Sequence, residues 1–257
     1  MTRMPAVFVG HGSPMNALEN NRFTEAWHSF ARSVPAPRAI VAVSAHWWIN
    51  ATAVTAMEAP RTIHDFFGFP EELSRFGYPA PGSPEVANMV VDALSPAWVG
   101  RDMDSWGLDH GTWSVLAHMW PDASVPVVQL SLDATKSPGE HMELGRRLNV
   151  LRDEGILVMC SGNVVHNLGM IDWTAGESGR DWAVDFDAHV RGVMTSDPAS
   201  LVDVAGHPAH GLSVPTPEHF DPLFYLAGIA AESGSPAEVL VGGCVLGSLS
   251  MTSYVVG

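Results

Sequence analysis

Lysine is almost absent from this sequence. Among 257 residues only Lys136 is a lysine, and the basic residues number 13 against 28 acidic ones. The formal net charge is therefore -15, and no run of basic residues occurs. Binding to nucleic acid or to an anionic membrane surface needs clustered basic side chains that neutralise phosphates. We therefore expect neither nucleic acid nor a membrane as a partner.

Cysteine and long apolar runs are also scarce. The two cysteines, Cys160 and Cys244, lie far apart in apolar stretches, which indicates small core residues rather than a disulfide or a CxxC pair. No run of about 18 apolar residues occurs, so we expect no membrane-spanning helix. The N-terminus lacks the basic and then apolar segments of a signal peptide. These features predict a cytoplasmic protein.

Apolar residues, by contrast, make up 46% of the chain and charged residues only 16%. This composition is typical of a compact globular protein and excludes a disordered one. The length fits one α/β domain, and neither a repeat nor a linker interrupts the chain. We therefore predict a single catalytic domain over residues 1–257.

Short apolar runs alternate with amphipathic segments along the chain. Runs rich in Val, Ile and Leu predict buried strands at 6–9, 39–44, 125–131 and 156–161. Spacing and capping residues predict helices at 21–33, 83–94, 112–120, 137–154, 181–195 and 217–231. Nearly continuous apolar strands are buried on both faces of a mainly parallel sheet. The fold class is therefore α/β, with a mainly parallel mixed sheet flanked by helices.

Histidine is plentiful, with 12 copies, and three of them directly follow predicted strands: His11, His46 and His166. In open α/β sheets, ligands bind at the carboxyl ends of the strands. Neutral imidazole is a common ligand of zinc, iron and copper. A single histidine after a strand is commonly an ordinary loop residue. Three at equivalent positions favour a shared metal site, although the residues alone leave both interpretations open.

Other candidates are less distinct. His110 lies in a turn before a helix, where it either donates to a substrate oxygen or has no chemical role. His219 opens the helix predicted at 217–231 next to Glu218, and neighbouring helical residues face different directions, so at most one should point at a metal. Trp47 and Trp48 follow His46, and either both pack in the core or one of them walls the metal pocket. The residues alone leave each of these pairs of roles open.

Motifs of other enzyme classes are missing. The sequence has no G-x-S-x-G nucleophile elbow, no H-E-x-x-H and no Walker A motif. Ser13 and Ser161 lie near the predicted crevice, so serine hydrolysis stays open, but neither serine has an obvious acid partner.

Five segments occur in an order that resembles the DOPA extradiol dioxygenase-like family, within the class III extradiol ring-cleavage dioxygenases. The segments are VGHGSPMNAL (9–18), VSAHWW (43–48), LDHGTWSVL (108–116), SGNVVHNLG (161–169) and PEHFDPLFYLAG (217–228). Together they extend the resemblance from residue 7 to about residue 230. The resemblance implies a single-domain α/β fold with a metal ion in a crevice.

The resemblance also implies roles for five histidines. His11 and His46 match the two metal histidines of the family. His219 stands where distant relatives have a glutamate ligand. His166 matches a histidine that serves as an acid/base and, in some members, as a further metal ligand. His110 matches the histidine that faces the substrate.

The implied reaction is extradiol cleavage of a catechol-type aromatic, DOPA-like or related, by O2. We expect Fe(II) for this activity, while an all-histidine site suits Zn(II) equally well, so the purified protein could carry zinc. In the implied mechanism His166 takes a hydroxyl proton and His110 steadies a substrate oxygen. Trp47, Phe66 and Phe67 would form the apolar wall around the substrate.

Two alternatives from other classes remain at this point. The first is a zinc-dependent hydrolase, in which His11, His46 and His219 hold Zn(II), and His166 acts as the base for a metal-activated water. The second is a non-enzymatic partner-binding protein on the same fold with a vestigial metal pocket.

Overall fold

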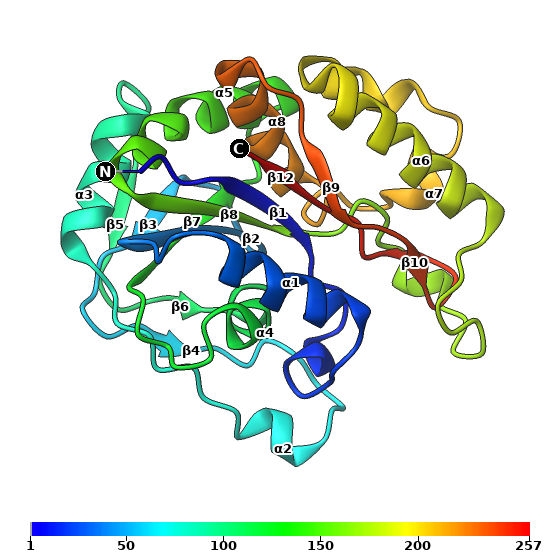
Figure 1. Cartoon of the computed structure of the whole chain (residues 1–257), viewed down its shortest axis with the longest axis horizontal. Coiled ribbons are helices and arrows are strands. Elements are labelled where there is room, and N and C mark those ends of the chain that lie inside the picture. Colours follow the sequence, from blue (N-terminus) through cyan, green and yellow to red (C-terminus); the bar gives the residue numbers. More distant parts are fainter. Residues whose placement is uncertain (1) are drawn as a thin grey trace.

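An eight-stranded mixed sheet runs through the middle of the computed structural model, which describes residues 2–257 (Figure 1). The strand order is β5-β3-β7-β2-β8-β1-β12-β9. Its four central strands are mutually parallel: β7 (Val127–Asp133), β2 (Ala39–Ile49), β8 (Ile156–Gly162) and β1 (Ala6–Gly10). The predicted mainly parallel sheet is confirmed.

The outer strands give the sheet its mixed character. On one side, β3 pairs antiparallel with β7 and parallel with β5. On the other side, β12 pairs antiparallel with both β1 and β9. The bounds of these strands are Ala53–Thr55 (β3), Gly100–Asp102 (β5), Glu238–Val241 (β9) and Ser253–Val256 (β12).

Helices cover both faces of the sheet, and side chains that alternate along each strand supply both cores. In β1, Val7 and Val9 pack with Trp27 and Trp113, whereas the residues between them face the opposite core. One face therefore carries α1 (Arg22–Ser33) and α4 (His110–Met119). The other carries α3 (Pro84–Leu94), α5 (Pro138–Leu148), α6 (Asp181–Ser196) and α8 (Asp221–Ser233). The α/β class is confirmed.

Shorter elements complete the chain. Two small sheets pair β4 (Arg61–Thr62) with β6 (Gly107–Leu108), and β10 (Cys244–Val245) with β11 (Leu249–Ser250). Short helical segments are α2 (Glu71–Ser74), α7 (His210–Ser213) and the 3-10 turns η1 (Pro14–Ala17), η2 (Asn149–Glu154), η3 (Leu168–Met170) and η4 (Pro198–Gly206). Within residues 2–257, no helix has both the length and the hydrophobicity that a membrane span requires.

Local capping chemistry fixes several predicted helix ends. The side chains of Asn21, Ser83 and Ser137 each accept backbone N–H groups at the start of α1, α3 and α5. The helix predicted at 137–154 is α5 followed by the 3-10 turn η2. Gly155 ends it in a left-handed conformation with φ 74°.

Strand β2 is longer than predicted, and this changes the position of His46. The strand continues to Ile49, so His46 lies within β2 rather than beyond its end. Its pairing with β7 is irregular between Val43 and Trp48, while its pairing with β8 ends at Ser44. The sequence pattern missed this because the strand continues through an irregular segment that lacks regular partners.

Two helices begin at other residues than predicted. Helix α4 begins at His110, because buried Asp109 is its N-cap and accepts the backbone N–H of Thr112. Helix α8 begins at Asp221, four residues later than predicted, so His219 lies in a turn. The helical argument that separates the directions of His219 and Glu218 therefore does not apply.

Candidate metal centre and active site

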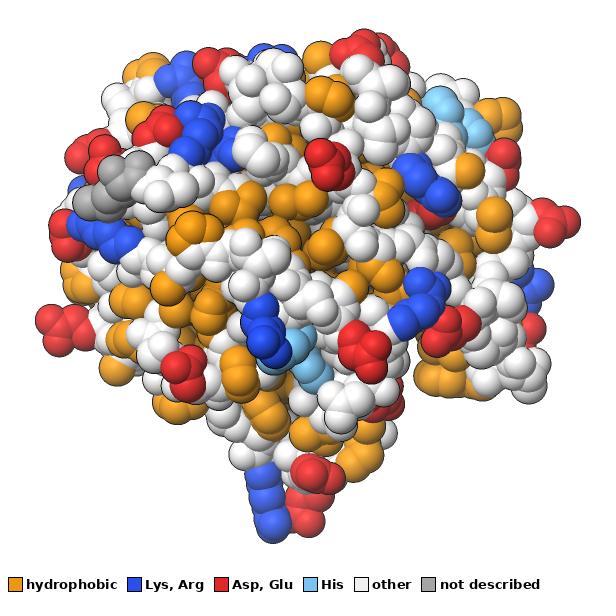
Figure 2. Space-filling model, viewed as in Figure 1, with side chains coloured by type: hydrophobic (Ala, Val, Ile, Leu, Met, Phe, Trp, Pro, Cys, Tyr) orange, Lys and Arg blue, Asp and Glu red, His pale blue; other side chains and the backbone are white. Residues whose placement is uncertain are grey.

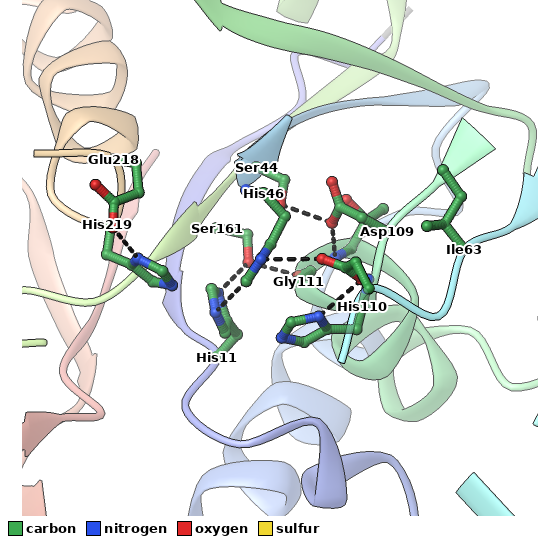
Figure 3. Close-up of polar contacts among 12 residues, drawn as sticks. His11, Ser44, His46, Ile63, Asp109, His110, Gly111, Ser161, Glu218 and His219 are labelled. Carbon is green, nitrogen blue, oxygen red and sulfur yellow. Dashed lines mark hydrogen bonds and ion pairs between the residues drawn. The ribbon is translucent and has the colours of Figure 1, made fainter. Parts of the chain in front are cut away.

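Five imidazoles converge beside the ends of the parallel strands: His11, His46, His110, His166 and His219. Figure 3 shows His11, His46, His110 and His219. The first directly follows β1, the second lies in β2, and the last precedes α8. Ring centroids are 5.1 Å apart for His11 and His46, and 5.0 Å apart for His46 and His219. The sheet thus brings together all five histidines singled out in the sequence.

The hydrogen bond of His11 fixes which ring nitrogen is free. Its Nδ1 lies 3.0 Å from Ser161 Oγ, and the Ser161 hydroxyl donates to the carbonyl of Gly111 at 2.5 Å. Since that hydroxyl proton is committed to Gly111, Ser161 accepts a hydrogen bond from the Nδ1–H of His11. Nε2 of His11 is left without a proton and has a free lone pair.

Carboxylates accept a hydrogen bond from Nδ1 of two other histidines. Nδ1 of His46 lies 3.0 Å from Asp65 Oδ2, and Nδ1 of His219 lies 3.3 Å from Glu218 Oε1. An ionised carboxylate only accepts hydrogen bonds, so each Nδ1 carries the proton. A carboxylate behind a histidine in this way is the usual support of a metal ligand. Nε2 is therefore the nitrogen that both imidazoles leave free for a ligand.

The approach of His11 to His46 requires a cation between their rings. Nε2 of His11 and Nε2 of His46 are 3.2 Å apart, and both rings place their other nitrogen on an acceptor. Two lone pairs at this distance repel unless a proton or metal ion lies against them. Because the site offers imidazoles without a thiolate, its residues fit Fe(II), Zn(II) or Cu(II).

Electrostatics keep most of these imidazoles neutral. Burial, reinforced by the neighbouring imidazoles, lowers the pKa of His11 and of His219 well below the ordinary value. Burial also acts on His46, but the hydrogen bond to Asp65 and nearby carboxylates outweigh it and raise the pKa of His46. Metal binding requires neutral imidazoles, so His11 and His219 are ready to bind.

Two glycines allow the backbone and the rings to approach this closely. A Cβ at Gly111 would lie 2.7 Å from Ser44 Oγ and 2.9 Å from Cδ2 of His46. A Cβ at Gly162 would lie 2.2 Å from the carbonyl oxygen of His219. Any side chain at either position would displace a histidine.

His166 packs against the ring of His219. Their rings stack with centroids 3.5 Å apart and an interplanar angle of 6°. His166, Glu218 and His219 form a second group whose ligand atoms lie within 4.8 Å of one another, beside the group of His11, His46 and His110. Burial lowers the pKa of His166 to about 4, so its ring is neutral at pH 7 and keeps a free lone pair.

His110 is positioned by its helix and by Asp65. Its Nδ1 lies 2.9 Å from Asp65 Oδ1, which also accepts its backbone N–H at 3.2 Å. Beneath it, buried Asp109 accepts the hydroxyl of Ser44 at 2.7 Å and the side-chain amide of Gln129. Burial is the main cause of a lowered pKa at His110, which is thus neutral at pH 7.

The structure brings only one of the three predicted wall residues to the cluster. The Phe66 ring lies edge-on to His110, with centroids 5.6 Å apart. Trp47 is buried and stacks on Trp106 at 5.7 Å, and Phe67 is 95% exposed.

No motif in the sequence singles out Asp65, whereas Trp48 was considered with Trp47 as a possible wall of the metal pocket. Trp48 is 40% exposed and follows His46 by two residues in β2. Asp65 lies in the loop between β4 and α2. One acidic residue among 28 stands out only when its histidine partners are seen. Ser161, considered as a nucleophile, has its hydroxyl proton committed to a backbone carbonyl.

Comparison with known proteins agrees with this geometry. The family model of the catalytic LigB subunit of aromatic ring-opening dioxygenases matches residues 2–257. The chain belongs to this family. The ring-opening dioxygenase class expected from the sequence motifs is thereby confirmed, and the partner-binding alternative is set aside.

The similarity to individual relatives covers nearly the whole chain. The chain is 49% identical over 260 residues to the Escherichia coli K12 protein named 4,5-DOPA dioxygenase extradiol, covering 100% of this chain and 96% of the relative. It is 37% identical to a Beta vulgaris protein of the same name, covering 96% and 94%. A crystal structure of an uncharacterized Escherichia coli K12 protein matches with a TM-score of 0.87 at 45% identity, covering 99% of this chain and 100% of that one.

The pKa shifts predict how many protons leave when metal binds. At pH 5.5, three histidines of ordinary pKa would release about 2.7 protons. Because the pKa values of His11 and His219 are lowered, these rings are already neutral, and we expect release of about one proton, from His46. Calorimetric titration of metal-free protein with Zn(II), in buffers of different ionisation enthalpy, gives this number. Release of about three protons would contradict the assignment.

Proposed function

We propose that this extradiol dioxygenase opens the ring of a DOPA-like catechol, with Fe(II) held by Nε2 of His11, His46 and His219. The observation that carries the proposal is the convergence of three imidazoles whose Nδ1 atoms are engaged by Ser161, Asp65 and Glu218. The names of the relatives supply the class of substrate.

The neighbouring side chains provide the proton chemistry. When bound, Fe(II) supplies the redox chemistry by which O2 enters the ring as the carbon–carbon bond beside the diol breaks. His166 is neutral and accepts a proton from one catechol hydroxyl at a ring nitrogen. Nε2 of His110 faces the second oxygen of the diol, and the Phe66 ring shields that side from water.

The charges around the site favour a substrate with an amine. No Lys or Arg among residues 2–257 contributes to the pKa of His166 or Asp221. Burial and the charge of Glu218 raise the pKa of Asp221 to about 7, as expected for carboxyl groups without a nearby cation. Glu218 uses Oε1 for His219 and for the hydroxyl of Thr216. Its other oxygen is available to the ammonium group of a DOPA-like side chain.

Iron dependence separates this proposal from zinc hydrolysis. Metal-free protein is loaded with Fe(II) or Zn(II) without air and then mixed with oxygenated catechols. We expect a yellow ring-opened product and O2 uptake with iron alone, and a loss of at least about 100-fold in kcat for His166→Gln, in line with removal of a general base. A protein that turns over no catechol with iron, but hydrolyses esters with zinc, would establish the alternative.

The role of Glu218 is tested by a pair of substrates. Glu218→Gln keeps an oxygen for His219 but removes the charge. We expect KM for dopamine to rise about 10-fold, the loss of one charged hydrogen bond of about 1.5 kcal/mol, with a change below about twofold for 4-ethylcatechol. Steady-state kinetics on both substrates measures the split. An equal rise for the two would show that Glu218 acts only through His219.

A further inference from the structure

Asp65 contacts two histidines that come from different parts of the fold. Its Oδ2 lies 3.0 Å from Nδ1 of His46 in β2, and its Oδ1 lies 2.9 Å from Nδ1 of His110 at the start of α4. Oδ1 also accepts the backbone N–H of His110 at 3.2 Å. Three N–H groups thus converge on one carboxylate whose side chain is only 19% exposed.

The loop around Asp65 is held in place independently of these histidines. The carbonyl of Ile63 accepts the indole N–H of Trp113 at 2.8 Å, and Nε2 of His64 lies 2.8 Å from the carbonyl of Phe76. The backbone N–H of Ile63 bonds to the carbonyl of Leu108 at 2.7 Å. The carboxylate is therefore delivered from a fixed backbone rather than recruited by the imidazoles.

The geometry points to Asp65 as a single positioning residue that sets the tautomers of His46 and His110 together. In His46 it holds the proton on Nδ1 and so turns the lone pair of Nε2 toward the metal position. In His110 it also holds the proton on Nδ1, so that the lone pair of Nε2 is turned toward the substrate. His110 thereby takes a proton from the second catechol hydroxyl instead of donating to it. The proton transfer from the catechol to His110 rests on the proposed function. The assignment of the two histidine tautomers does not rest on it.

Two substitutions separate the two halves of this role. Asp65→Asn retains one acceptor oxygen. We expect this oxygen to face His110, because His110 offers it two N–H groups. The amide NH2 then faces the Nδ1–H of His46, and two donors oppose each other. We expect zinc affinity to fall about 10- to 100-fold, the usual cost of losing such a partner. Asp65→Ala removes both acceptors, so His110 should also shift toward the Nε2–H tautomer.

Both readouts are independent of turnover. Zinc affinity is measured by competition with a chelator, and the tautomer of His110 by long-range ¹H–¹⁵N NMR of the zinc-loaded protein at pH 8. Asp102→Asn is the matched control, because Asp102 also accepts loop N–H groups, from Ser105 and Trp106, without touching a histidine. Circular dichroism checks that each variant is folded.

The expected result is weaker zinc binding in both Asp65 variants, a changed tautomer of His110 in Asp65→Ala, and neither effect in Asp102→Asn. The inference is overturned if Asp65→Asn binds zinc within twofold of the unsubstituted protein, or if His110 keeps the Nδ1–H tautomer in Asp65→Ala. Failure to cleave any catechol would count against the proposed function and leave these two measurements interpretable.

Discussion

The site depends on one constraint: each of three histidines has its Nδ1 held by a hydrogen-bond acceptor, so that each must present Nε2. The acceptors are chemically different, a serine behind His11 and carboxylates behind His46 and His219. Nε2 of His11 and Nε2 of His46 lie 3.2 Å apart, so the constraint leaves a place for a proton or a metal ion between the two rings. The pKa values agree, because His11 and His219 stay neutral without metal.

The fold meets the constraint by combining elements that are distant in sequence. The parallel strands β1, β2 and β8 deliver His11, His46 and Ser161 to one edge of the sheet. The loop between β4 and α2 brings the carboxylate of Asp65, and the turn before α8 brings His219. Glycines let these segments come within contact distance. Burial then gives the polar groups few partners besides one another, which makes the arrangement specific.

The sequence predicted the sheet, the helices and the convergence of histidines, because buried parallel strands and helix caps leave strong local patterns. It did not predict the length of β2, since residues 45–47 lack the regular pairing that the pattern assumes. It placed Glu218 and His219 on a helix, whereas they lie in a turn and contact each other. Asp65 could not be chosen from sequence, because its role depends on two histidines from other elements. The ligand set and the part played by His166 remain proposals.

Anomalous diffraction at the zinc edge, from crystals loaded with zinc as a redox-inert substitute, tests the central claim most directly. The account predicts one strong peak at about 2.0–2.1 Å from Nε2 of His11, His46 and His219. It also predicts that Nδ1 of each ring keeps its bond to Ser161, Asp65 or Glu218. A peak bound by Nδ1 of any of these rings, or one held by His166 and Glu218 without His11 and His46, would contradict the account.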